Sequence, residues 1–411
     1  MAETYETAVE KERVILLAVE LTESVEYSLD ELEELAETAG AETVGRLVQK
    51  REAFHPGTYI GKGKMDELRE MVVRLSADTV VCDDELSPAQ ITNLQDELEC
   101  RVIDRTVLIL DIFAAHARTS EGKLQVELAQ LRYRSSRLIG LGKVLSRLGG
   151  GIGTRGPGEK KLEMDRRLIK ERIATLNRQL KDVVQSRDTM RRQRSLSQTP
   201  TVAIVGYTNA GKSTLLNTLT EASVLEEDKL FATLDPTTRA LEMENGQKIL
   251  FTDTVGFISK LPHQLIKAFR STLEEAKYAD LILHVVDASN PEYERQMEVV
   301  YDTLKELGVV DKPVLTAFNK IDCVHEGEKD FLKDLKSDGF VQISAKHSQG
   351  LDLMLEEIER HLNAGFVQIE KVIPYAEAGY LQKVRQYGKL EKEEYREDGI
   401  FVKASVPPAL V

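Results

Sequence analysis

Residues 1–115 alternate between short, continuous apolar runs and stretches in which apolar residues recur every three or four positions. The first pattern predicts buried strands and the second predicts helices that cover them, so we expect a small α/β domain here. The predicted strands are Val14–Val19, Thr79–Cys82 and the short Arg101–Ile103, Thr43–Lys50 continues the pattern, and the helical stretches are Ser28–Thr38, Lys64–Leu75 and Pro88–Leu98.

Two helix starts in this region carry further predictions. Ser28 is expected to cap its helix, because Glu31 stands three residues later, as in a capping box. The turn 59–64 contains two glycines and precedes the next helix, where backbone N–H groups can bind an anion. It lacks the six-residue glycine fingerprint of dinucleotide sites, so an ordinary basic turn is the favoured interpretation.

Residues 124–148 form the next helical pattern, and a second one follows from Leu162 to Val183. The spacings in the second pattern are seven, four, three, four and three, which is typical of a seam between two helices. The glycine-rich segment Gly149–Gly158 lies between them, so we predict an α-hairpin whose tip carries Arg155. Such a slender tip suits phosphate contacts in a narrow cavity; the alternative is an ordinary flexible connection.

Charge distinguishes this hairpin from the rest of the chain. Residues 131–195 contain 18 Lys or Arg and 6 Asp or Glu, a net charge of +12. The whole chain carries −14, so the remainder carries −26. A basic segment inside an acidic chain is typical of a nucleic-acid contact, although a solvated coiled-coil face without a partner is the alternative.

A phosphate-binding loop follows the apolar run Val202–Val205. Residues 206–213 read Gly-Tyr-Thr-Asn-Ala-Gly-Lys-Ser, which is the complete G-x-x-x-x-G-K-[ST] pattern between a strand and a helix. Gly206 and Gly211 let the backbone wrap around phosphates, Lys212 reaches the terminal phosphates, and Ser213 offers its hydroxyl to Mg²⁺. The predicted contacts in this loop are Gly206, Tyr207, Thr208, Asn209, Ala210, Gly211, Lys212, Ser213 and Thr214.

Three further elements predict a guanine nucleotide at this loop. Asp253-Thr254-Val255-Gly256 ends an apolar strand, which places Asp253 near the magnesium and Gly256 near the γ-phosphate. Asp322, in Asn319-Lys320-Ile321-Asp322, can accept from the N1–H and N2–H₂ groups of guanine, which adenine lacks there. Asn319 can bond the base edge or brace the loop, and the Lys320 stem can lie over the ring. In Ser344-Ala345-Lys346, the N–H of Ala345 can donate to guanine O6.

A nucleotide switch also needs a threonine that senses the magnesium and the γ-phosphate. We select Thr233 from the segment Phe231-Ala232-Thr233-Leu234-Asp235, with Thr237 and Thr238 as alternatives. The predicted metal ligands are therefore Ser213, Thr233 and Asp253.

Together these elements resemble the signature of translation-factor-class GTPases over residues 200–365. The resemblance implies GTP binding and GTP hydrolysis with Mg²⁺, and we assign catalytic roles to Lys212, Thr233, Gly256 and Asn209. Phe257 stands where Ras-type enzymes have the glutamine that orients water, so slow intrinsic hydrolysis is expected until a partner completes the site. In some related GTPases an asparagine at the position of Asn209 binds K⁺; loop-bracing hydrogen bonds are the alternative.

Composition narrows the remaining possibilities. Three cysteines in 411 residues, none in a C-x-x-C pair, predict a reducing compartment and no metal framework. No apolar run approaches the ~18 residues that a membrane span needs. The polar, acidic start is not typical of a signal peptide. We therefore expect a cytoplasmic monomer, with ribosome or membrane association left open.

The whole chain resembles the HflX family of ribosome-associated GTPases. The resemblance is carried by Gly153-Thr154-Arg155-Gly156-Pro157-Gly158-Glu159, Leu162-Glu163 with Asp165-Arg166-Arg167, Ser87-Pro88-Ala89-Gln90 and Phe231-Ala232-Thr233-Leu234-Asp235-Pro236. Lys160 departs from the family's usual threonine. The resemblance implies binding to the large ribosomal subunit and its rRNA through residues 124–195, and the splitting or rescue of stalled ribosomes.

The predicted architecture is a multidomain α/β protein. Its GTPase domain is expected to have a parallel-type sheet with helices on both faces, and the tail to form a small α+β domain. The expected domains are an N-terminal α/β domain at 1–115, a basic hairpin at 116–198 with its tip at 149–158, a GTPase domain at 199–365 and the tail at 366–411. A GTP-dependent regulator that acts on a protein or membrane partner is the second hypothesis, but the hairpin has no Trp or Phe stripe for lipid insertion.

Overall fold

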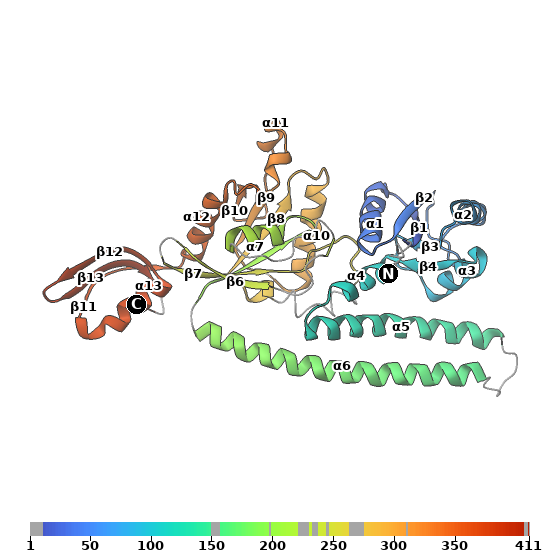
Figure 1. Cartoon of the computed structure of the whole chain (residues 1–411), viewed down its shortest axis with the longest axis horizontal. Coiled ribbons are helices and arrows are strands. Elements are labelled where there is room, and N and C mark those ends of the chain that lie inside the picture. The colour runs from blue at the N-terminus through green and yellow to red at the C-terminus, as the bar shows by residue number, and fades with distance from the viewer. Residues whose placement is uncertain are drawn as a thin grey trace, which may run out of the picture. The chain divides into compact units, whose positions relative to one another are not determined.

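The computed structural model describes residues 11–148, 157–196, 199–220, 230–231, 237–243, 246–262, 275–309, 311–406 and 410 (Figure 1). The chain divides into two compact units. Unit 1 comprises residues 1–182 and 260–268, and unit 2 comprises residues 183–259 and 269–411. The predicted fold class, a multidomain α/β protein, is confirmed.

Unit 1 contains a four-stranded parallel sheet in the order β2-β1-β3-β4. Helices α2 and α3 pack against one face through a core that includes Ile15, Leu68 and Leu94, while α1 and α4 contact each other and the sheet. The elements are β1 (Arg13–Glu20), α1 (Glu26–Thr38), β2 (Glu42–Lys50), α2 (Lys62–Leu75), β3 (Thr79–Cys82), α3 (Pro88–Leu98), β4 (Arg101–Asp104) and α4 (Arg105–His116).

Two features of unit 1 differ from the sequence prediction. Helix α1 begins at Glu26, so Ser28 lies inside its first turn and does not cap it. The buried hydroxyl of Ser28 instead donates to Asp83, and Glu31 pairs with Arg105. The capping box that does form belongs to α3, where the side chains of Ser87 and Gln90 bond each other's backbone N–H. Helix α4 was not predicted at all.

Helices α5 (Ser120–Leu148) and α6 (Pro157–Leu196) run side by side as a long hairpin (Figure 1). The Arg172 guanidinium pairs with Glu127 at 2.7 Å, and Arg132 donates to Asn177 at 3.2 Å. The middle of α5 is bonded to the sheet, because Arg137 and Tyr133 both bond the fully buried carboxylate of Asp104 at the end of β4. Most of the predicted tip, residues 149–156, lies outside the described residues.

Unit 2 contains a six-stranded sheet in the order β10-β9-β8-β5-β7-β6. All neighbours are parallel except the edge strand β6, which is antiparallel to β7. Helices α7 and α12 share one hydrophobic core with the strands, and Met297 of α10 packs into a second core with Val286 and Phe318. The elements are β5 (Thr201–Gly206), α7 (Lys212–Thr220), β6 (Thr237–Glu242), β7 (Lys248–Asp253), β8 (Leu281–Asp287), α10 (Tyr293–Glu306), β9 (Val314–Asn319), β10 (Gly339–Gln342) and α12 (Leu351–Leu362).

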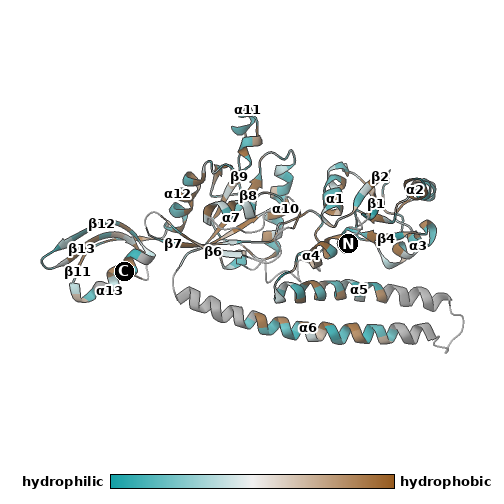
Figure 2. Ribbon diagram, in the orientation of Figure 1, coloured by the Kyte–Doolittle hydropathy of each residue, from teal (hydrophilic) through white to brown (hydrophobic). Residues whose placement is uncertain are grey.

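The central strands β5 and β8 are hydrophobic and buried along nearly their whole length, as expected for strands covered on both faces, whereas the edge strand β6 is mostly polar and partly exposed (Figure 2). The tail forms a separate antiparallel sheet in the order β11-β13-β12, and α13 shares one hydrophobic core with it. Its elements are β11 (Val367–Ile373), α13 (Ala378–Tyr387), β12 (Lys389–Arg396) and β13 (Gly399–Val406).

Candidate nucleotide-binding site

The parallel strands of unit 2 bring the predicted motifs to one edge of the sheet. Gly206, Asp253, Asp287 and Asn319 are the last residues of β5, β7, β8 and β9, which are neighbours. Ligands of open α/β sheets bind outside these carboxyl ends, where the connecting loops meet. Motifs separated by more than 100 residues in the sequence therefore converge on a single loop cluster.

Steric space explains the two glycines of the phosphate loop. A Cβ on Gly206 would lie 2.2 Å from the carbonyl oxygen of Val285 on the neighbouring strand. A Cβ on Gly211, whose φ is +90°, would lie 2.3 Å from Nδ2 of Asn319. Both contacts are far below any observed for a real Cβ, so the loop can follow this path only with glycine at both positions.

Lys212 begins helix α7 and is buried beneath the loop. Its ammonium donates to the carbonyl of Tyr207 at 2.6 Å. Burial lowers the pKa of Lys212 to about 8, and the nearby carboxylate of Asp253 only partly opposes this shift. Phosphate oxygens would stabilise the charged form of Lys212, so an anion bound in this loop would raise the pKa of the lysine.

The predicted magnesium ligands Ser213 and Asp253 are brought together. The Ser213 hydroxyl donates to Oδ2 of Asp253 at 2.7 Å, and Asp253 is fully buried. A hydroxyl and a carboxylate beside a phosphate loop are oxygen donors of the kind Mg²⁺ prefers, so these residues fit the ion. The third predicted ligand, Thr233, lies outside the described residues together with Ala232, Leu234 and Asp235.

The alternatives to Thr233 lie on the edge strand β6. Thr237 pairs in register with Asp253, and the Thr238 hydroxyl bonds that of Thr252 at 2.9 Å. Phe231, predicted in the same segment, is buried with a φ of +58°.

Asn319 connects the phosphate loop with the two loops predicted to bind guanine. Its Nδ2 donates to the carbonyl of Ala210 at 2.9 Å, and its Oδ1 accepts from the N–H of Ala345 at 2.9 Å. Of the two roles predicted for Asn319, the structure shows bracing of the loops. The Ala345 N–H was predicted to donate to guanine O6, but here Asn319 already accepts it.

The loop after β9 presents Asp322 at its surface. Lys320 has a φ of +61° and pairs with Asp287 at 2.7 Å, which fixes the turn. A hydrogen bond from Ser344 is the main cause that lowers the pKa of Asp322, so this carboxylate is ionised and able to accept hydrogen bonds. Ile321 is buried, and Lys346 follows Ala345 in the next loop. Asp287 was not predicted, although its place at the end of an apolar strand was a readable signal.

Phe257 is held away from solvent. It is 2% exposed, and its backbone forms a parallel bridge with Tyr207 through bonds of 3.1 Å to the Gly206 carbonyl and 2.8 Å from the Thr208 N–H. Gly256 packs closely on Thr208 and Lys212, since a Cβ there would lie 2.9 Å from Cα of Thr208. A side chain that cannot bond water is thus also fixed in the interior, while Gly256 lies over the phosphate loop.

The fold and this loop cluster define a phosphate-loop GTPase. Three family models agree: "GTP-binding GTPase N-terminal" matches residues 26–114, "GTP-binding GTPase Middle Region" matches 116–194, and "50S ribosome-binding GTPase" matches 201–320.

Curated relatives specify the family. The chain is 60% identical to "GTPase HflX" of Lacrimispora saccharolytica over 412 residues, covering 100% of this chain and 97% of the relative. It is 42% identical to "GTPase HflX" of Escherichia coli, covering 94% and 92%. The chain belongs to the HflX family and is a GTP-hydrolysing enzyme.

The chain is also similar to a solved structure, a GTP-binding protein of Sulfolobus solfataricus in complex with GDP, at 25% identity and a TM-score of 0.44, covering 86% of this chain and 99% of that chain.

Proposed function

We propose that this GTPase binds the large ribosomal subunit through the α5–α6 hairpin and uses GTP hydrolysis to end that contact, separating or rescuing stalled ribosomes. The observation that carries the proposal is a basic hairpin whose helix α5 is bonded to the unit 1 sheet through Asp104. Arg134, Lys170 and Lys181 are exposed on it, and none has a carboxylate within ion-pair distance among the described residues. Exposed cations along a helical hairpin are suited to rRNA phosphates.

In the proposed catalytic cycle, each loop has a defined task. The phosphate loop and Lys212 bind the phosphates, Asp322 selects guanine, and the Gly256 N–H contacts the γ-phosphate. Ser213, Asp253 and Thr233 would hold Mg²⁺, which supplies positive charge to the phosphate oxygens. We propose no role in water activation for the buried Phe257, so the fast reaction requires a group from the partner.

Asn209 is the proposed K⁺ ligand. It lies exposed on the loop with a φ of +60°, and its side chain has no hydrogen-bond partner among the described residues. Among those residues the structure therefore shows no loop-bracing contact of its side chain. Turnover of the parent protein should rise when K⁺ replaces Na⁺, and Asn209→Ala should lose this response; equal rates in both salts would refute the proposal.

The partner proposal is tested by GTP turnover with and without purified large ribosomal subunits, with ATP as the nucleotide control. We expect strong stimulation with GTP alone. No stimulation, with normal GTP affinity, would refute the ribosomal proposal and favour a regulator with another partner. No helix among the described residues is long and apolar enough to cross a membrane.

A charge-matched pair of variants then localises the contact. The triple variant Arg134→Glu, Lys170→Glu and Lys181→Glu should lose subunit binding and stimulation but keep its intrinsic rate. The control carries the same change at three exposed lysines of unit 2, Lys277, Lys305 and Lys383. If both variants lose binding equally, net charge rather than the hairpin is responsible. Binding should also weaken steeply with salt.

A further inference from the structure

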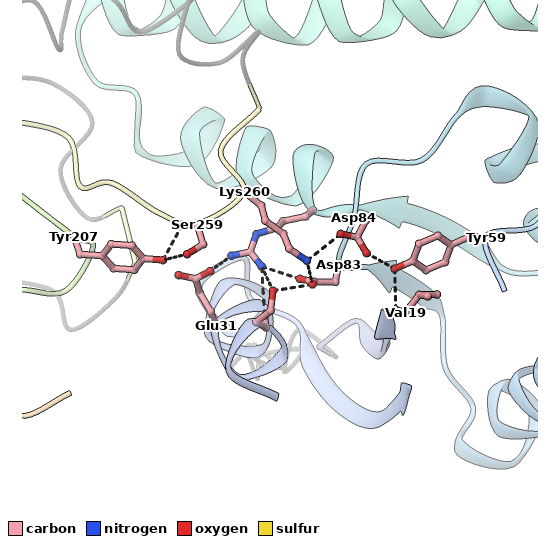
Figure 3. Close-up of polar contacts among 10 residues, drawn as sticks. Val19, Glu31, Tyr59, Asp83, Asp84, Tyr207, Ser259 and Lys260 are labelled. Atoms are coloured by element: carbon pink, nitrogen blue, oxygen red, sulfur yellow. Dashed lines mark hydrogen bonds and ion pairs between the residues drawn. The ribbon is translucent and has the colours of Figure 1, made fainter. Parts of the chain in front are cut away.

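The residues that follow Gly256 are hydrogen-bonded to Tyr207, which comes directly after the first glycine of the phosphate loop. Beyond the backbone bridge of Phe257, the hydroxyl of Tyr207 accepts from the N–H of Ser259 at 2.7 Å and bonds the Ser259 hydroxyl at 2.7 Å (Figure 3). Residues 257–259 are thus fixed to the nucleotide site within unit 2, and any displacement of Gly256 acts directly on them.

The next residue, Lys260, belongs to unit 1. Its ammonium contacts Oδ2 of Asp83 and lies 2.9 Å from Oδ1 of Asp84 (Figure 3). These two carboxylates directly follow β3, at the carboxyl end of the unit 1 sheet. Lys260 also adopts a φ of +54°, a left-handed conformation that non-glycine residues keep only when their contacts impose it. The ion pair is such a contact.

The two carboxylates are themselves held by several elements of unit 1. Asp83 is fully buried and accepts from Ser28 at 2.7 Å and from Arg105 at 2.8 Å. Asp84 accepts from the Tyr59 hydroxyl at 2.5 Å, and that hydroxyl accepts from the N–H of Val19 at 3.1 Å. Asp83 and Asp84 are therefore held in place by other residues of unit 1, and they keep these hydrogen bonds when Lys260 moves away.

We propose that Lys260 is a positioning residue whose ion pair with Asp83 and Asp84 opposes the movement of Gly256 toward a γ-phosphate, and so couples the bound nucleotide to unit 1. Only three residues separate Gly256 from Lys260, and residues 257–259 are fixed to Tyr207. In the proposed coupling, a γ-phosphate that draws the Gly256 N–H toward itself pulls on residues 257–260, and opening the ion pair releases that pull, whereas GDP makes no such demand. By linkage, whatever stabilises the pair disfavours GTP relative to GDP.

The test compares the affinities of the full-length protein for GDP and for a non-hydrolysable GTP analogue. Lys260→Met should raise the preference for the analogue about five-fold or more, because the opposing contact is gone. Lys260→Arg keeps the charge and should stay within two-fold of the parent. The control Lys248→Met removes a lysine from an exposed pair with Glu242 in unit 2, and should also change nothing. A ratio for Lys260→Met within two-fold of the parent would overturn the proposal.

Asp84→Asn weakens the same ion pair by changing a carboxylate instead of the lysine. It keeps the proposal testable if Lys260→Met fails to fold. It should raise the same ratio, and the double variant should match the larger single effect, because both substitutions remove one interaction. Effects that add fully would contradict the proposal. Neither experiment needs ribosomes, so a failure of the ribosomal function leaves this test intact.

A structural readout separates coupling from a local packing effect. Amide hydrogen exchange at residues 79–84 should be faster with the GTP analogue than with GDP in the parent protein. In Lys260→Met the two nucleotides should give the same exchange. Equal exchange in the parent protein would overturn the coupling, whatever the affinities show.

Discussion

Replacing Asn319 should disconnect the phosphate loop from the guanine loops. Its side chain makes two buried hydrogen bonds of 2.9 Å, one to the Ala210 carbonyl and one from the Ala345 N–H. Both backbone partners are at least 99% buried, so Asn319→Ala leaves a donor and an acceptor without partners away from bulk water.

Each unsatisfied buried group costs about 1–3 kcal/mol, so the free energy of unfolding of unit 2 should fall by roughly 2–6 kcal/mol. The lower end is expected, since water can enter the space left by the shortened side chain. Asn319→Asp should be worse. It keeps the acceptor for Ala345 but sets a buried carboxylate oxygen against the Ala210 carbonyl, where a donor is required.

Urea unfolding measures stability, and equilibrium titration with GDP measures affinity. We expect both to decline in the order parent, Asn319→Ala, Asn319→Asp, with affinity reduced about ten-fold or more in the alanine variant, equivalent to about 1.4 kcal/mol. Asn363→Ala is the matched control, because among the described residues its side chain makes a single hydrogen bond, a long one of 3.5 Å from Gln247. An aspartate variant as stable as the parent would refute the bracing role.

Three further outcomes follow from burial and space. Burial lowers the pKa of Lys212 to about 8, so GTP should bind with proton uptake above pH 8 and weaken as pH rises; calorimetry in buffers of different ionisation enthalpy would show no uptake if this were wrong. Burial also lowers the pKa of His284 to about 4. As the pH falls, the unfolded chain therefore takes up a proton on this histidine before the folded chain does. The free energy of unfolding should fall by up to about 3 kcal/mol between pH 6.5 and pH 4. Urea midpoints should show a smaller fall for His284→Phe. Gly206→Ala should destabilise unit 2 by at least about 2 kcal/mol in thermal unfolding, because its Cβ meets the Val285 carbonyl; an unchanged midpoint would contradict the steric argument.

The sequence predicted the phosphate loop and the strand ends beside it because each of these motifs is local. A glycine pattern after an apolar run specifies a loop, and the carboxyl ends of parallel strands necessarily meet at one edge. The bracing by Asn319 and the pairing of Lys320 with Asp287 depend on which strands are neighbours. That strand order is a property of the folded sheet. The sequence therefore left two roles open for Asn319 and did not show that Lys320 pairs with Asp287.

The errors in unit 1 have a common physical origin. Helix α4 is apolar around most of its circumference because it is covered by α1, α5 and the sheet, so its sequence lacks the periodicity that reveals a surface helix. Ser28 and Glu31 fit a capping box locally, but the buried Asp83 and Arg105 compete for both side chains. Tertiary partners prevailed over local propensity.

This competition also bears on the contact of Lys260. Burial raises the pKa of Asp83, and the lysine ammonium opposes that rise. When Lys260 leaves, Arg105 and Ser28 still bond the Asp83 carboxylate, so this buried acidic group keeps hydrogen-bond partners. A contact with that property can open without leaving the buried carboxylate unpaired. Ser28 and Glu31 therefore do not cap α1. They belong to a network that holds Asp83 in place whether or not Lys260 is paired with it.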